Sequence, residues 1–247
     1  MSSLYSNLSS VYETMYQSFI NYEEEFSFYY NILLKYGCKS VLEIGCGSGH
    51  LAKQFVNTNF QYVGIDLSED MLTLARKNNA ASTFVQADMR NFILATKTDA
   101  AIITGRTISY LVTNMDLINC FNAIYKNIHE DAVLCFDCID ANKFIPQIDS
   151  TKKIIHEANF NDSIYKRESN WKINTETGFC FEWASSFFKE SNEQELESIG
   201  EDFSTIRTFT KDEIKLFLNL TGFSVIEIID RSSYSFDTFV IVATKIK

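Results

Sequence analysis

The chain has 247 residues, of which 46% are hydrophobic and 22% are charged, and its formal net charge is −10. This length accommodates one α/β domain with an insertion, and the composition is that of a folded protein. Lys and Arg do not cluster along the chain, so we expect no nucleic-acid partner. Neither a leader pattern nor a stretch of ~20 apolar residues is present, so we expect a cytoplasmic protein without a membrane partner.

Six cysteines, at positions 38, 46, 120, 135, 138 and 180, lie mostly within apolar strand or helix patterns. Such positions favour reduced core thiols over disulfides. Cys135 and Cys138 have C-x-x-C spacing, but they lie within one predicted strand and there is no second pair. We therefore expect core packing at these positions and no metal site.

Helices and strands alternate over the first part of the chain. Apolar residues recur with helical period over 11–36, where Gly37 ends a predicted lead-in helix, and Ser68 is a predicted N-cap. The predicted strands are 40–45, 60–66, 82–87, 99–104 and 132–137, and the predicted helices are 49–57, 68–78, 115–128 and 140–148. Alternation of this kind predicts a parallel sheet with helices on both faces.

After residue 152 the pattern changes to that of antiparallel strands. The predicted strands are 154–156, 163–173 and 179–188, and the acidic segment 190–202 is a predicted solvated loop. A capping box, Thr210 and Glu213, then begins a helix, and strands at 223–230 and 237–244 form a hairpin. We divide the chain into a helix and core at 1–152, an inserted β meander at 153–209, and a helix and hairpin at 210–247 that complete the core sheet.

Three alternate glycines, Gly45, Gly47 and Gly49, connect a predicted strand to a predicted helix. Glycine permits unusual backbone dihedrals and close approach of a ligand, and the following helix begins with free N–H groups. The next strand ends at Asp66, whose carboxylate can accept both hydroxyls of a ribose. The pattern indicates a nucleoside cofactor, with a purely structural tight turn as the alternative.

The glycine spacing is G-x-G-x-G, which differs from the G-x-G-x-x-G fingerprint of dinucleotide sites because His50 occupies the third glycine position. Three carboxylates, Glu43, Asp66 and Asp88, fall near the carboxyl ends of adjacent predicted strands. Open parallel sheets bind ligands at that edge, so we expect these side chains to share one site.

The segments Val41–Gly49, Val63–Leu72 and Gln86–Arg90 resemble the first three motifs of the class I S-adenosylmethionine-dependent methyltransferases. The resemblance implies S-adenosylmethionine as cofactor and S-adenosylhomocysteine as product. It also implies a Rossmann-like, seven-stranded, mostly parallel sheet with helices on both faces and one antiparallel strand from the last hairpin. The β meander is then an inserted lid.

The same resemblance assigns roles to individual residues. It implies that Asp66 binds the ribose, that Asp88 and Met89 lie against the adenine, and that the backbone from Gly45 to Gly49 carries the methionine end. Glu43 then orders the loop or the amino group. Further implied cofactor contacts are Tyr16, Cys46, Leu67, Met71 and Thr104.

The aromatic lead-in helix and the β meander resemble bacterial small-molecule N-methyltransferases of the amino-sugar type. This resemblance implies a small-molecule acceptor, with an amine nitrogen favoured because its methylation needs alignment and closeness more than acid–base help. The alternatives are an O- or C-methyltransferase, which needs a base, and a non-catalytic cofactor-binding protein of the same fold. A homodimer is compatible with these features.

Three residues are candidate catalytic groups. Tyr12 and Tyr16 share one face of the lead-in helix, where packing of an aromatic core is the alternative. His156 lies in the β meander, and lone surface histidines of this kind are common.

Three other residues are candidate substrate contacts. Arg106 and Tyr110 follow the fourth predicted strand, where an Arg can hold a carboxylate or phosphate of the substrate or, alternatively, pair with a local carboxylate. Trp171 lies in the β meander, where it can line a lid or pack the lid onto the core.

Overall fold

The structure is a computed structural model that describes residues 20–160, 163–174, 176, 178–190, 196–232 and 236–246. Tyr12 and Tyr16, the two candidate catalytic tyrosines, therefore lie outside the described residues. Of the predicted lead-in helix, the described part begins at Tyr22, directly after an N-cap at Asn21, and Gly37 follows its end with a φ of 70°.

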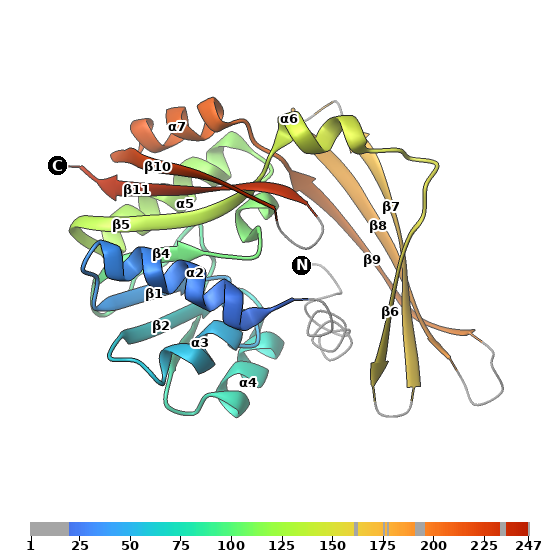
Figure 1. Cartoon of the computed structure of the whole chain (residues 1–247), viewed down its shortest axis with the longest axis horizontal. Helices are drawn as coiled ribbons and strands as arrows, with labels where there is room; N and C mark the ends of the chain where they lie inside the picture. Colours follow the sequence, from blue (N-terminus) through green and yellow to red (C-terminus); the bar gives the residue numbers. More distant parts are fainter. Residues whose placement is uncertain are drawn as a thin grey trace.

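A seven-stranded sheet forms the core, in the order β10-β11-β5-β4-β1-β2-β3 (Figure 1). Its strands are β1 (Ser40–Ile44), β2 (Gln61–Asp66), β3 (Thr83–Gln86), β4 (Thr98–Ile103), β5 (Ile128–Ile139), β10 (Phe223–Ser232) and β11 (Asp237–Lys245). Strands β1 to β5 pair in parallel, whereas β11 is antiparallel to both of its neighbours. The predicted Rossmann-like sheet with one antiparallel strand is thereby confirmed.

The described helices lie where the sequence pattern predicts them, and three of them connect parallel strands. They are α2 (Tyr22–Lys35), α3 (His50–Phe55), α4 (Glu69–Asn78), α5 (Asn114–Asn127), α6 (Ala141–Phe144) and α7 (Lys211–Leu220), with 3-10 helices η2 (Thr107–Tyr110) and η3 (Ile145–Gln147). Ser68 caps α4 by accepting a hydrogen bond from the Met71 N–H, and Thr210 and Glu213 form the predicted capping box of α7. These caps satisfy backbone groups that the first helical turn leaves unpaired.

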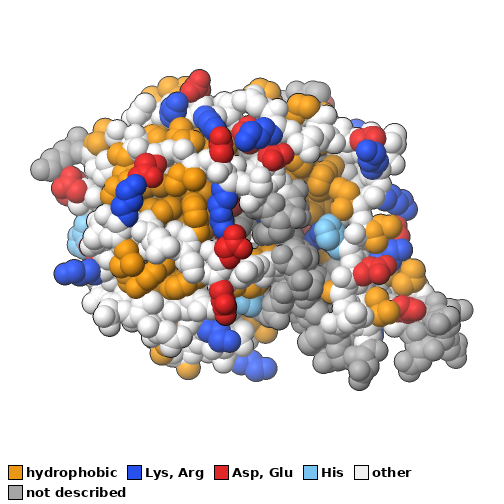
Figure 2. All heavy atoms as spheres, in the orientation of Figure 1, with side chains coloured by type: hydrophobic (Ala, Val, Ile, Leu, Met, Phe, Trp, Pro, Cys, Tyr) orange, Lys and Arg blue, Asp and Glu red, His pale blue; other side chains and the backbone are white. Residues whose placement is uncertain are grey.

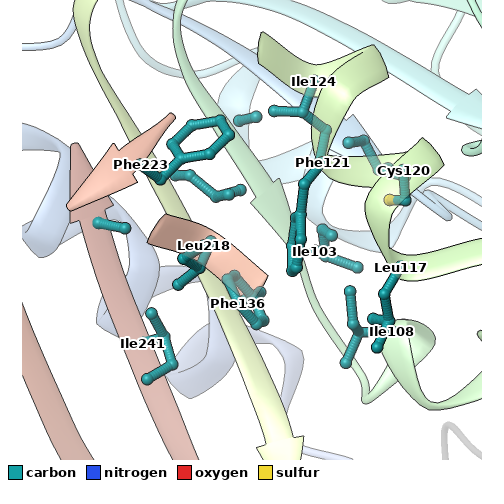
Figure 3. Packing of buried hydrophobic residues seen from close by; sticks show 14 of the residues in the cluster. Ile103, Ile108, Leu117, Cys120, Phe121, Ile124, Phe136, Leu218, Phe223 and Ile241 are labelled. Carbon is teal, nitrogen blue, oxygen red and sulfur yellow. The ribbon is translucent and has the colours of Figure 1, made fainter. Parts of the chain in front are cut away.

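The two faces of the sheet are covered by different helices. On one face, side chains of α5 and α7 such as Phe121 and Leu218 pack against Phe136 and Ile103 of the sheet (Figure 3). On the other face, α2 and α3 contribute Leu33 and Phe55 to a second cluster of buried side chains. Figure 1 shows α2 crossing in front of the sheet and α5 behind it. The predicted covering of both faces is therefore correct.

A second sheet contains four antiparallel strands in the order β6-β7-β8-β9, and it stands beside the core sheet (Figure 1). Its strands are β6 (Ile154–Phe160), β7 (Ser163–Asn174), β8 (Cys180–Glu190) and β9 (Leu196–Arg207). The prediction of a solvated loop at 190–202 is wrong from Leu196 onward, because β9 pairs with β8 along its whole length. Acidic residues there occupy an edge strand of the second sheet, which pairs with β8 on one side.

The end of β9 is tied to the core by one buried arginine. Arg207 is 5% exposed, and its guanidinium donates hydrogen bonds to the Val112 carbonyl (3.3 Å), to Asn114 Oδ1 (2.7 Å) and to Glu213 Oε1 (2.6 Å). One side chain of β9 thus binds both the segment that follows η2 and the first turn of α7. The arrangement fixes where the second sheet leaves the core.

Charged side chains of both signs are mixed on the face of the molecule drawn in Figure 2. Several of them form exposed ion pairs, among them Lys211 with Asp230 and Arg76 with Glu69. None of the helices in the described part of the chain is long and apolar enough to cross a membrane.

Candidate functional site

A cavity of about 300 Å³ lies where the parallel strands end at their carboxyl edge. Two halves of it differ in composition. The carboxylate half is lined by residues at and after the ends of β1, β2 and β3. The aromatic half is lined by the loop and 3-10 helix after β4, by the last residue of β5, by the second sheet and by the segment before β11. Residues of the aromatic half are Thr104, Gly105, Arg106, Thr107, Ser109, Tyr110, Ile139, Trp183, Ile206 and Phe236.

The glycine loop adopts a backbone that other residues would strain. Gly45, Gly47 and Gly49 have φ angles of 72°, 54° and 80°, all in the left-handed region. A Cβ on Gly45 would collide with the Thr107 side chain, and one on Gly49 would lie 2.7 Å from Asn79 Nδ2. Gly45 and Gly47 line the cavity, whereas Gly49 supports the loop from behind as the N-cap residue of α3.

Asp66 holds the glycine loop from the end of β2. One carboxylate oxygen accepts the Gly47 N–H at 2.9 Å, and the other accepts the Ser68 N–H at 2.8 Å. Burial raises the pKa of this carboxyl, and the backbone hydrogen bonds oppose that shift. Since a carboxylate offers about four acceptor positions, capacity remains for two ligand hydroxyls on the cavity side.

Glu43 joins three strands beneath the loop. It is 2% exposed, accepts a hydrogen bond from the Tyr62 hydroxyl at 2.6 Å, and lies 3.4 Å from Thr104 Oγ1. Burial raises the pKa of its carboxyl from 4.5 to about 7, although both hydroxyl donors lower it. The side chain is therefore a buried connector of β1, β2 and β4 that also lines the cavity.

Asp88 differs from Asp66 because its oxygens are engaged by a neighbour. Arg90 Nη2 lies 2.6 Å from Asp88 Oδ2, and the hydrogen bonds from this guanidinium hold the pKa of the Asp88 carboxyl below its usual range. Met89, Met71 and Leu67 line the cavity around it with apolar atoms. This part of the carboxylate half suits a flat, weakly polar ring.

The loop after β4 carries Arg106 in a left-handed conformation, with a φ of 62°. Its backbone N–H donates to Asp137 Oδ1 at 2.9 Å, and its guanidinium lies 4.8 Å from the centre of the Phe236 ring. Burial raises the pKa of Asp137 to about 6, and the Arg106 charge opposes that shift. Arg106 and Tyr110 both line the cavity, which places these two predicted substrate contacts together.

Five aromatic side chains, Phe144, Trp171, Phe181, Trp183 and Phe236, form a cluster between the core and the second sheet. Phe236 is at its centre, with ring-centre distances of 4.8 Å to Phe144, 5.5 Å to Trp171 and 5.8 Å to Trp183. Trp183 and Phe236 line the cavity, whereas Trp171 does not and packs behind them. The predicted substrate contact at Trp171 is thus replaced at the cavity surface by Trp183.

His156 lies on β6, away from the residues that line the cavity. Its Nδ1 is 3.1 Å from Arg167 Nη2, and burial, followed by the Arg167 charge, lowers the pKa of the imidazole. Arg167 in turn lies over the Trp183 ring at 5.3 Å. His156 therefore reaches the cavity only through two intervening side chains, and this geometry does not support a direct catalytic role.

Most of the predicted cofactor contacts converge on the cavity: Glu43, Gly45, Cys46, Gly47, Asp66, Leu67, Met71, Asp88, Met89 and Thr104. Several lining residues were not predicted as site residues. Tyr22 and His50 stack with ring centres 3.8 Å apart beside the glycine loop. Ser109, Ile139, Ile206 and Phe236 carry no local motif, and only the apolar alternation of β8 pointed to Trp183.

Comparisons with known proteins agree with this geometry. Residues 41–131 match the family model described as a methyltransferase domain. A Geobacillus sp. (strain WCH70) protein that bears the name "Putative methyltransferase" is 28% identical over 204 residues, which are 78% of this chain and 76% of that protein. The dTDP-3-amino-3,4,6-trideoxy-alpha-D-glucopyranose N,N-dimethyltransferase of Streptomyces venezuelae is 40% identical over 82 residues, 32% of this chain and 33% of that enzyme.

Two solved structures share the fold over nearly the whole chain. One is an amino pentose methyltransferase from Micromonospora echinaspora with bound S-adenosylmethionine, with a TM-score of 0.80, 19% identity, and coverage of 95% of this chain and 96% of that one. The other is an S-adenosylmethionine-dependent methyltransferase from Clostridium acetobutylicum, with a TM-score of 0.77, 16% identity, and coverage of 98% and 99%. At these identities the likeness concerns the fold, including the second sheet.

Proposed function

Because this chain belongs to the S-adenosylmethionine-dependent methyltransferases, we propose that it methylates the amine nitrogen of a small molecule held in the aromatic half of the cavity. The observation that carries this proposal is the separation of carboxylates and imidazole from the aromatic half. Among the described lining residues, every carboxylate and the single imidazole, His50, lie at or after the ends of β1, β2 and β3.

The carboxylate half fits the cofactor. Asp66 retains acceptor capacity for the ribose hydroxyls, and the left-handed backbone at Gly45 and Gly47 leaves room for the methionine end. Met89 and Met71 offer apolar contact to the adenine, while Asp88 is oriented by Arg90. In this proposal Glu43 acts indirectly, because it fixes the strands beneath the loop.

When bound, S-adenosylmethionine would supply a methyl group that is already electrophilic, and the methylated nitrogen would release its proton to bulk water after the product leaves the cavity. The chain's own residues align the nitrogen and exclude water. A neutral amine needs no general base, whereas an oxygen or carbon acceptor does. The composition of the aromatic half is therefore suited to nitrogen.

The aromatic half also keeps the amine in its reactive, uncharged form. An alkyl amine has an ordinary pKa of about 10 in water, and apolar surroundings lower that pKa because they disfavour the ammonium. Trp183, Ile206 and Phe236 provide such surroundings, and the positive charge of Arg106 acts in the same direction. Arg106 and Tyr110 are then the side chains that orient the acceptor.

Two further observations support a small-molecule acceptor in the cytoplasm. The Streptomyces relatives are named for N,N-dimethylation of sugar amines, and the charges on the face shown in Figure 2 do not gather into a basic patch. All six cysteines are buried and none forms a disulfide, which suits a reducing compartment.

The test is transfer of a labelled methyl group to a panel of acceptors. The panel contains primary amines with and without a ring, the dTDP-linked amino sugar of the Streptomyces relative, and a catechol as oxygen acceptor, each at pH 7 and 9. We expect label in amines and not in the catechol. Label in the catechol alone would contradict the nitrogen assignment, and tight binding of S-adenosylhomocysteine without any turnover would favour a non-catalytic protein.

A further inference from the structure

Two buried hydrogen-bond donors lie in the aromatic half without a partner. Ser109 Oγ and Trp183 Nε1 are both shielded from solvent, and neither has a hydrogen-bond partner in the part of the chain that the structure describes. Both residues line the cavity. A buried donor left unpaired costs roughly 1–3 kcal/mol, so such groups normally have a partner. A bound acceptor molecule can supply it.

The aromatic half has two polar side chains that can only donate and four hydroxyls that can donate or accept. Arg106 and Trp183 are the two donors, and the hydroxyls are those of Thr104, Thr107, Ser109 and Tyr110. Among the described residues that line the cavity there is no Asn or Gln, and each carboxylate belongs to the carboxylate half. A ligand with many hydroxyls needs an acceptor for each of its O–H donors, and the described side chains of this half offer hydroxyl oxygens but no carboxylate or amide oxygen. It is matched instead to a ligand oxygen that accepts.

Two aromatic rings contribute to the lining of the aromatic half, although Trp171 and Arg106 pack against Phe236 and Arg167 lies over Trp183. Trp183 and Phe236 line the cavity with their rings 5.8 Å apart and inclined by 63°. Ring pairs of this kind gain from offset or edge-to-face contact with another aromatic ring. Arg106 is the only Lys or Arg among the described lining residues. One positive charge matches the single charge of a carboxylate better than the two charges of a diphosphate.

We propose that the methyl acceptor is an alkyl amine that also carries an aromatic ring and a carboxylate or carbonyl oxygen, with its ring against Trp183 and Phe236 and its oxygen bound by Trp183 Nε1, Ser109 Oγ and Arg106. This inference rests on the proposed amine methylation, and it narrows the acceptor to one chemical class. The ring, the oxygen and the amine are separate requirements, so each can be removed in turn.

The experiment measures binding by calorimetry to the full chain saturated with S-adenosylhomocysteine, using four probes. L-Phenylalanine has ring, oxygen and amine, 2-phenylethylamine lacks the oxygen, and L-alanine lacks the ring. The dTDP-linked amino sugar carries its amine on a saturated sugar ring, and its aromatic thymine is separated from that amine by the diphosphate. We expect phenylalanine to bind about tenfold tighter than each of the other three, since one charge-assisted hydrogen bond or one ring contact is worth about that much.

Variants connect the preference to particular atoms. Trp183→Phe and Ser109→Ala should each weaken phenylalanine binding about tenfold and leave 2-phenylethylamine unchanged. Trp171→Phe is the matched control, because its indole N–H is also buried without a partner among the described residues but the side chain does not line the cavity. Trp171 and Trp183 are the only tryptophans, so quenching of their fluorescence gives a second readout.

Undetectable phenylalanine binding, equal binding of alanine or the amino sugar, or an equal effect of Trp171→Phe would overturn the inference. Label transfer separates this failure from failure of the proposed function. If amines are methylated but a ring and an oxygen bring no advantage, only the acceptor class is wrong. If phenylalanine binds as expected and no amine in the panel accepts a methyl group, the proposed nitrogen methylation is wrong.

Discussion

The carboxylate half of the cavity is made of backbone and acidic side chains from one continuous stretch of strand–helix repeats, whereas the aromatic half is assembled from segments far apart in the chain. Glu43, Asp66 and Asp88 come within about fifty positions of one another. The aromatic half brings the loop after β4 together with β8, β9 and the segment before β11. The first half depends on local backbone geometry, and the second on where the β6–β9 sheet sits.

This difference separates the consequences of mutation. A change in the carboxylate half should act on cofactor binding or on the core, because its side chains hold the loop and three strands. A change in the aromatic half should act on binding of the methyl acceptor, provided that the second sheet stays attached to the core. The following four expectations test that separation, and they begin with the attachment itself.

Arg207→Met should have the largest effect. It removes a buried charge that binds Val112, Asn114 and Glu213. Removing one partner of such a buried ion pair costs about 4 kcal/mol of unfolding free energy. The measurement is urea unfolding at pH 7. Lys211→Met, which breaks the exposed pair with Asp230, is the control and should cost less than about 1 kcal/mol. Equal losses in the two variants would mean that Arg207 does not anchor the second sheet.

Glu43 should make stability depend on pH. Its pKa is raised from 4.5 when unfolded to about 7 when folded, so the folded state holds the proton more tightly and stability falls as pH rises from 4.5 to 7. The shift corresponds to about 3 kcal/mol. Glu43→Gln should remove this component from unfolding curves measured at several pH values, and the exposed Glu197→Gln should not. Superimposable pH profiles of Glu43→Gln and the parent chain would rule out this role.

Asp66→Ala should weaken binding of S-adenosylhomocysteine by about 2 kcal/mol, or about thirtyfold, because it removes both the loop's hydrogen bonds and the acceptor for ligand hydroxyls. Calorimetry gives the dissociation constant. Asp70→Ala, at an exposed site in the first turn of α4, is the matched control. Unchanged affinity in Asp66→Ala would refute the ribose assignment.

Phe236→Leu should have the smallest effect and should be confined to the acceptor. Loss of the ring contacts at the centre of the aromatic cluster is expected to raise KM for the amine substrate about fivefold, or about 1 kcal/mol. The affinity for the cofactor should be unchanged. Phe203→Leu is the control because Phe203 is 63% exposed on the opposite face of the second sheet. A change in cofactor affinity without a change in KM would show that the two halves are not separable.

The carboxylate half was predictable because parallel strands end at one edge of the sheet. The positions of Glu43, Asp66 and Asp88 at the ends of successive strands therefore imply that they meet, and they line one cavity. Gly49 shows the limit of this reasoning, since the same motif does not say which glycine lines the cavity and which supports the loop from behind.

The aromatic half was not predictable to the same degree. Alternation along the second sheet places Trp171 and Trp183 on the same face, opposite each other in neighbouring strands. Which of the two lines the cavity depends on how that sheet is inclined to the core, and the structure shows that it is Trp183. Phe236 and Ser109 belong to a turn and a 3-10 helix, where no periodicity marks a side chain as part of a site.

The sequence by itself determined the α/β core, the order of its strands and helices, and the nucleoside-binding edge, because these follow from hydrophobic period, caps and glycine positions that act over a few residues. Only the tertiary structure decided which residues form the aromatic half of the cavity. Its aromatic rings and its two unpaired donors, Ser109 Oγ and Trp183 Nε1, come from segments up to 127 positions apart, between Ser109 and Phe236. They meet because buried Arg207 and the packing around Phe236 hold the second sheet against the core.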